Sequence, residues 1–172
     1  QLGQYERTVM GEIEASGDRS TIDEAMKHLL VGGNACLDTT QFQSRLFKMD
    51  NYVVRRDPRG VVAEGILREG ITKATAPDEL KGLLTDSKFG DDDVIHVYTH
   101  ILLKEGFYVT YQEVNGKMVP GSAGKYKRNE MPYIFLRFSR IDGEDYGRGF
   151  IEEVYGDLSS LEALSEAIVQ GA

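Results

Sequence analysis

The chain has 172 residues, of which 41% are apolar and 28% are charged. This composition is typical of globular proteins, and the length fits one domain with a core of its own. Twenty Lys and Arg residues against 28 Asp and Glu residues give a net charge of −8 at pH 7. That balance argues against tight binding of nucleic-acid phosphates or an anionic membrane surface, since both need clustered positive charge.

Cysteine content and hydropathy exclude further classes of protein. Cys36 is the single cysteine, so the chain forms no intrachain disulfide and no multi-cysteine zinc or iron–sulfur site. The most apolar stretch, residues 94–103, is interrupted by His96, Thr99 and His100. It is shorter than the roughly 18–20 apolar residues that span a bilayer. We therefore expect no membrane partner.

Two helices are predicted at the start of the chain. Leu2, Tyr5, Val9 and Ile13 share one helical face, and the helix is expected to end near Gly17. A second helix is predicted from about residue 20 to residues 32–33, with Thr21 and Glu24 at the spacing of a capping box. Because the link is only a few residues long, the pair is compatible with a helical hairpin.

The central part of the chain shows strand patterns. Short strands are predicted at 35–37, 51–56 and 61–67, and a Pro58-containing turn at 57–60 joins the last two. A short helix is predicted from residue 76. The strongest β pattern gives strands at 94–103 and 107–112, a type I′ turn at Asn115-Gly116 and a returning strand at 117–119. Residues 121–129 are expected to form a loop, and residues 133–138 another strand.

The final segment is predicted to be helical from about Gly149. Ile151, Val154, Leu158, Leu161 and Ile168 stay roughly in phase in a single long helix, which would tolerate Gly156 at a cost of about 1 kcal/mol. In the alternative, Ser159 and Glu162 cap a separate second helix. Helices followed by an antiparallel β meander and a last helix predict the α+β class.

Two histidines raise the question of a metal site. His96 and His100 are four residues apart and follow an aspartate run at 91–93. On a helix they would share a face, but in a strand four residues span roughly 13 Å, too far for two ligands of one ion. We expect no metal site. The alternative function, a small metal-dependent hydrolase using these histidines and an aspartate, requires the strand prediction to be wrong.

Other motifs predict no chemistry either. Residues 142–153 match a calcium-binding loop at Asp142, Gly147 and Glu153, but Tyr146 and Gly149 occupy positions that need other residue types. The same glycines lack the full phosphate-binding fingerprint. We therefore expect no catalytic residue and no cofactor.

Five segments resemble, in the same order, the portal (head-to-tail connector) proteins of short-tailed bacteriophages. They are LVGGNA at 30–35, YVVRRD at 52–57, VIHVYTHI at 94–101, PYI at 132–134 and DGEDYGRGFIEEVYGDLSSLE at 142–162. The resemblance covers nearly the whole chain, and its last segment is the most specific. Portal subunits are considerably longer, and this chain starts at Gln1, so we expect a fragment. It would comprise a wing-like domain at 1–148 and the start of a long stem-directed helix at 149–172.

The resemblance implies a structural protein of the virion, assembled in the host cytoplasm. Portal subunits form a ring, usually of twelve copies, at one capsid vertex, through which double-stranded DNA passes during packaging and ejection. Capsid, scaffolding, terminase and tail proteins would be partners of the whole portal. The resemblance also implies no enzymatic activity, because a separate terminase motor supplies the work, and no tight binding of the DNA.

Rings use head-to-tail interfaces in which two different patches of one subunit must match. Charged turns and the last helix are the candidates for these patches. The candidate subunit-interface residues are Arg55, Arg56, Asp91, Asp92, Arg148, Glu152 and Glu153. A further alternative is a monomeric adaptor domain that binds another protein.

Overall fold

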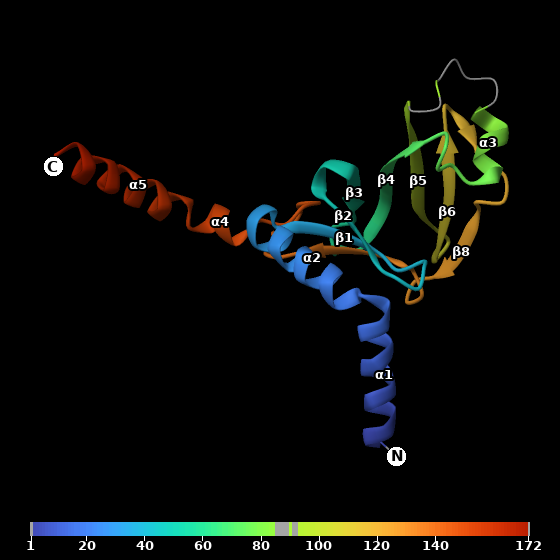
Figure 1. Cartoon of the computed structure of the whole chain (residues 1–172), viewed down its shortest axis with the longest axis horizontal. Coiled ribbons are helices and arrows are strands. Elements are labelled where there is room, and N and C mark those ends of the chain that lie inside the picture. Colours follow the sequence, from blue (N-terminus) through green and yellow to red (C-terminus); the bar gives the residue numbers. More distant parts are fainter. Residues whose placement is uncertain (1, 85–89, 91–92, 172) are drawn as a thin grey trace.

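The computed structural model describes residues 2–84, 90 and 93–171 and has an α+β fold, as predicted (Figure 1). Its helices are α1 (Leu2–Ser16), α2 (Asp18–Gly32), α3 (Asp78–Leu84), α4 (Phe150–Glu153) and α5 (Tyr155–Gln170), with a 3₁₀ turn at Met49–Asn51. Its strands are β1 (Asn34–Asp38), β2 (Arg45–Phe47), β3 (Tyr52–Arg56), β4 (Val62–Thr72), β5 (Val94–Lys104), β6 (Phe107–Val114), β7 (Lys117–Met118), β8 (Gly124–Lys127) and β9 (Tyr133–Arg137).

A small antiparallel sheet of order β2-β1-β9 joins distant parts of the chain. Strand β1 pairs with β9 from Asn34 opposite Arg137 to Asp38 opposite Tyr133. Helix α2 covers one face of this sheet. The apolar residues of that layer are Ala25, Leu29, Ala35, Leu37, Leu46 and Leu136.

The larger sheet has the order β3-β4-β5-β6-β7, and β8 also pairs with β6. Burial alternates along β5, so Ile95, Val97 and Ile101 face the interior while His96 and Tyr98 face solvent. The inner face of the large sheet packs against the small sheet. The buried residues of this interface are Cys36 and Phe47 from the small sheet and Tyr52, Val54, Val62, Leu67, Ile101 and Tyr108 from the large one. A second core cluster forms where Leu80 of α3 and Ala76, just before α3, pack with Ile95, Val97, Val114 and Val119.

A glycine in β4 lets the two sheets approach each other. The Phe135 ring lies so close to Gly65 that a Cβ there would be 2.6 Å from the Phe135 Cζ. The same ring makes an edge contact with Tyr52 at a centroid distance of 5.6 Å. Gly65 reduces the β propensity of its strand, but it provides the space that the aromatic packing requires.

The first two helices differ from the predicted arrangement. Only Gly17, with φ of 74°, separates α1 from α2, and α1 runs away from the body of the protein rather than folding back along α2 (Figure 1). The capping box prediction is wrong, because α2 begins at Asp18 and the Thr21 hydroxyl donates to the Ser44 carbonyl instead. Most of the predicted stripe of α1 is exposed, with Leu2 and Tyr5 at 87% and 71%, while Ile13 is partly buried.

The hairpin turns are confirmed, while short strands without a strong pattern were missed. Asn115 and Gly116 both have positive φ, at 51° and 76°, as a type I′ turn requires. The expected loop at 121–129 contains β8, which pairs with β6 through Lys125 and Tyr126. Strand β2 was also unpredicted.

The C-terminal segment is interrupted where neither prediction placed a break. Helix α4 ends at Glu153, Val154 has φ of −100° and ψ of 7°, and α5 begins at Tyr155. Helix α5 extends away from the body (Figure 1), and all of its residues are exposed. No helix among the described residues is both long and apolar enough to cross a membrane.

Candidate functional site

The predicted interface residues of β3 lie in different environments. Arg55 is on the outer face of the large sheet, where its side chain is 71% exposed and pairs with Glu64 at 2.9 Å. Arg56 lies at the end of β3 and is half-buried. Its guanidinium donates to the carbonyls of Asp145, Gly60 and Phe135 at 2.9–3.0 Å. Arg55 is therefore available to a partner, while Arg56 ties three segments of the chain together.

The remaining predicted residues that the structure describes gather at the start of α4. Arg148 makes ion pairs with Glu144 at 3.2 Å and with Glu152 at 3.6 Å. Glu152 and Glu153 lie in the first turn of α4, where the helix dipole favours negative charge. The exposure of these side chains fits an interface. Asp91 and Asp92 lie outside the described residues.

The start of α4 is held tightly against the end of α2. A Cβ on Gly149 would lie 2.3 Å from the Val31 carbonyl oxygen, and one on Gly33 would lie 2.3 Å from the Arg148 carbonyl carbon. Gly33 also has φ of 72°, which a glycine adopts without strain. The glycines around Arg148 therefore serve close backbone packing, and this explains the Gly-rich motif without a bound phosphate.

Exposed apolar residues mark the two projecting helices. In α5, exposure reaches 61% for Leu161, 63% for Leu164 and 72% for Ile168. A cluster of exposed apolar side chains is typical of a surface that another protein covers. The sequence periodicity indicated these stripes but not their exposure, because an apolar helical face has the same pattern whether its own domain or a partner covers it.

The geometry does not support the metal-dependent hydrolase. His96 and His100 both lie on β5, as the strand prediction required. His100 stacks on Tyr111 with 4.6 Å between ring centroids, and its Nε2 lies 3.4 Å from a Glu113 carboxylate oxygen. Within the described residues, no group of three or more His, Cys, Asp and Glu side chains is placed to hold a metal ion.

Cys36 and the predicted near-match to a calcium loop have structural explanations. Burial, and to a lesser extent the charge of Asp38, raises the pKa of the Cys36 thiol, which favours the unreactive protonated form. In the loop, Asp145 accepts a hydrogen bond from the Arg56 N–H, and Asp142 is 91% exposed beside Arg140. The loop carboxylates point to separate contacts rather than to one centre.

Comparison with known proteins assigns the family. Residues 1–172 match the family described as bacteriophage head to tail connecting protein. This chain belongs to that family. Among its relatives, the portal protein of Escherichia phage T7 is 41% identical over 180 residues, and that of Enterobacteria phage T3 is 39% identical over 179 residues. The portal protein of Enterobacteria phage SP6 is 33% identical over 177 residues.

These alignments cover 98–99% of this chain but only 33–34% of each relative. The chain thus spans about a third of the length of the portal proteins that it matches.

Proposed function

We propose that this chain is a structural segment of a portal ring that joins head to tail at one capsid vertex. The observation that carries this proposal is the family match along the entire chain, with relatives that are portal proteins. The exposed apolar faces of α1 and α5 support it, because helices that project from the domain need partners to cover them.

The proposed organisation has two parts. Residues 1–148 would form the wing-like domain, and residues 149–172 would begin the helix directed toward the stem. The tight contact of Gly149 with Val31 supports this division, because it holds the start of α4 against the domain while α5 extends away from it.

In the ring, usually of twelve copies in this family, Arg55, Arg56, Arg148, Glu152 and Glu153 are proposed contacts between subunits, together with Asp91 and Asp92. Opposite charges on two different patches would fix the register of neighbouring subunits more than they would add affinity. The ring would be a virion component assembled in the host cytoplasm, and the whole protein would meet capsid, scaffolding, terminase and tail proteins.

We also propose that the protein is not an enzyme and that double-stranded DNA passes it without tight binding. The net charge of −8 supports the weak binding of DNA, because each neutralised phosphate would add salt-dependent affinity and slow the passage of DNA. The expected result is no binding of duplex DNA at micromolar protein in moderate salt, measured by fluorescence anisotropy. Micromolar affinity would contradict this part of the proposal.

Electron microscopy of the purified complete protein tests the proposed function. We expect closed rings with an axial hole, in numbers that rise with protein concentration. Particles that stay monomeric at all concentrations, or that form only open filaments, would contradict it and would favour an adaptor domain.

A further inference from the structure

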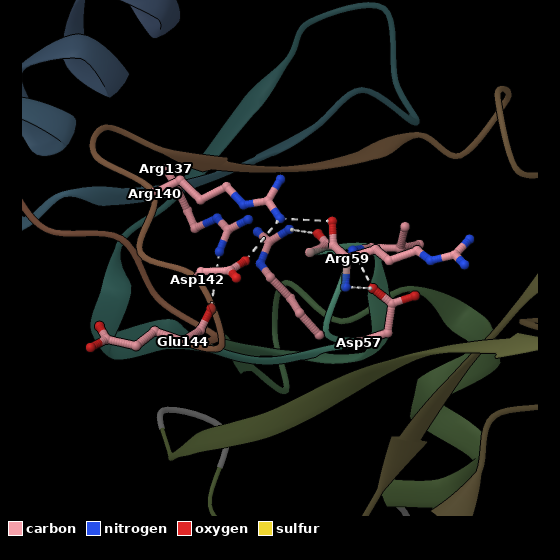
Figure 2. A network of polar contacts seen from close by, with 9 residues as sticks. Asp57, Arg59, Arg137, Arg140, Asp142 and Glu144 are labelled. Carbon is pink, nitrogen blue, oxygen red and sulfur yellow. Dashed lines mark hydrogen bonds and ion pairs between the residues drawn. The ribbon is translucent and has the colours of Figure 1, made fainter.

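Arginines from two segments of the chain, the end of β3 and residues 137–140, converge on the turn between β3 and β4 (Figure 2). A Cβ on Gly60 would lie 2.8 Å from Arg137 Nη2 and 3.0 Å from Arg140 Cζ, so both guanidiniums lie over the same glycine. Arg56 Nη1 donates to the Gly60 carbonyl at 3.0 Å. We call Arg56, Arg137 and Arg140 the arginine patch.

The patch is held in place chiefly by neutral carbonyl groups. Arg137 Nη1 donates to the Glu144 carbonyl, and Arg140 Nη2 donates to the Arg59 carbonyl, both at 3.0 Å. A guanidinium has five N–H donors. Within residues 2–84, 90 and 93–171, Arg137 Nη2 and Arg140 Nη1 have no hydrogen-bond acceptor. These two guanidiniums therefore keep donors available for an external group.

The carboxylates around the patch are engaged elsewhere. Asp57 Oδ1 accepts the backbone N–H groups of Arg59 and Val61 at 3.0 and 2.8 Å. Asp145 Oδ1 accepts the Arg56 N–H, and Glu144 Oε1 pairs with Arg148. Asp142 lies 3.7 Å from Arg140 Nη2, but its side chain is 91% exposed, so solvent weakens that ion pair.

Arg137 and Arg56 carry like charges in the patch. Burial, followed by repulsion from Arg137, lowers the pKa of Arg56. An external carboxylate would offset this repulsion, and the planar fork of a guanidinium matches the two oxygens of a carboxylate. The fixed turn at Gly60 and the carbonyl contacts of Arg56 prepare the site for such a group in advance.

We propose that the arginine patch binds carboxylates on the α5 helix of a second copy of the chain, an inference that rests on the ring architecture proposed above. Helix α5 carries Asp157, Glu162 and Glu166 and contains no Lys or Arg. All three side chains are exposed on a helix that projects from the body (Figure 1). The described ion pairs include none of them.

Charge complementarity favours a second copy over nucleic acid as the occupant. The chain as a whole carries −8, so it repels a polyanion while offering carboxylates of its own. The patch and α5 are different surfaces of one subunit, and pairing them between copies gives a head-to-tail contact, which is the type that closes into a ring.

Charge exchange in the complete protein tests whether the arginine patch pairs with α5 of a second copy. The first variant is Arg137→Glu with Arg140→Glu, the second is Glu162→Lys with Glu166→Lys, and the third combines all four substitutions. We expect each of the first two to weaken assembly at least tenfold by mass photometry and the third to restore most of it. Lys104→Glu with Lys117→Glu is the control for the change in net charge, and thermal unfolding verifies that each variant is folded.

Each alternative result overturns the pairing. Rings of unchanged affinity in both two-residue variants would overturn it and leave the proposed function intact, whereas failure of the unmodified protein to form rings would overturn both. If both two-residue variants assemble more weakly and the four-residue variant does not recover assembly, the patch and α5 act on separate partners. A further result would be binding of inorganic phosphate or duplex DNA at the patch. If Arg137→Glu with Arg140→Glu abolishes such binding while ring formation is unchanged, the patch is a phosphate site.

Discussion

Asn34 and Gly147 exchange two hydrogen bonds across 113 residues of sequence. The Asn34 Nδ2 donates to the Gly147 carbonyl at 2.7 Å, and the Gly147 N–H donates to the Asn34 Oδ1 at 2.7 Å. Asn34 is 3% exposed, so water does not replace these bonds easily. They link the start of β1 to the segment that leads into α4, and thereby fix the C-terminal helices relative to α2.

Substitution of Asn34 tests the importance of this link. Asn34→Ala leaves the buried N–H and carbonyl of Gly147 without partners, and each unsatisfied group costs about 1–3 kcal/mol. We expect the free energy of unfolding in urea to fall by about 2–4 kcal/mol. The exposed Asn129 provides the control, since Asn129→Ala should change it by less than about 0.5 kcal/mol. Equal stability of the two variants would contradict the assigned role.

Two glycines near the C-terminus should respond in opposite directions to alanine. In Gly149→Ala the new Cβ meets the Val31 carbonyl oxygen at 2.3 Å, and we expect a loss of about 1–3 kcal/mol. Gly156 in α5 has open space around its Cα, so Gly156→Ala should increase helix stability by about 0.5–1 kcal/mol. Thermal unfolding of both variants checks the sign of each change.

Leucines in the core and in α5 should separate folding from assembly. Leu67 is 1% exposed and Leu161 is 61% exposed. Leu67→Ala should lower the free energy of unfolding by about 2–5 kcal/mol through lost contacts and a cavity. Leu161→Ala should leave the stability of the monomer within about 0.5 kcal/mol and weaken the association of subunits. If Leu161→Ala destabilises the monomer as much as Leu67→Ala does, α5 is part of the core and not a contact surface.

The Cys36 thiol should react only when the domain opens. Cys36 is 0% exposed, and burial raises its pKa, so the nucleophilic thiolate is scarce and inaccessible at neutral pH. We expect labelling by an aromatic disulfide reagent to be very slow in buffer and rapid in denaturant. Rapid labelling in buffer, with the far-UV circular dichroism unchanged, would contradict the buried position.

Asp18 should contribute a pH-dependent part of stability. Hydrogen bonds from Ser44, and then from Ser16, lower the pKa of the Asp18 carboxyl. A lowered folded-state pKa adds stability above the unfolded-state pKa, and this contribution is lost as the pH falls through the folded-state value. Asp18→Asn should therefore be less stable than the unmodified protein above about pH 5, and the difference should shrink in acid. A difference that grows in acid would reverse the assignment.

The sequence was informative where hydrophobic periodicity and turn chemistry agreed. The alternation in β5 and the Asn115-Gly116 turn specify a local structure, and both predictions are confirmed. The capping prediction at Thr21 failed because its hydroxyl found a partner in Ser44, which is 23 residues distant. Strand β2 has three residues, too few for a periodic pattern, and its pairing with β1 depends on the tertiary structure.

Long-range contacts explain what the sequence did not reveal about the site. The clustering of Arg55 and Arg56 was visible in the sequence, but their different environments depend on whether each residue faces solvent or the loop before α4. Arg137 and Arg140 were not expected near Gly60, because the pairing of β1 with β9 places them there. The break at Val154 follows no Gly or Pro, and nothing in the described structure explains it.

Labelling of phage particles tests most directly whether this chain belongs to the connector between head and tail. An epitope inserted at the exposed Asn115-Gly116 turn should tolerate insertion, and antibody fragments bound to it are visible by electron cryo-tomography. The account predicts label at a single vertex of each particle, where the head meets the tail. Label spread over all vertices, or confined to the distal tail, would contradict it.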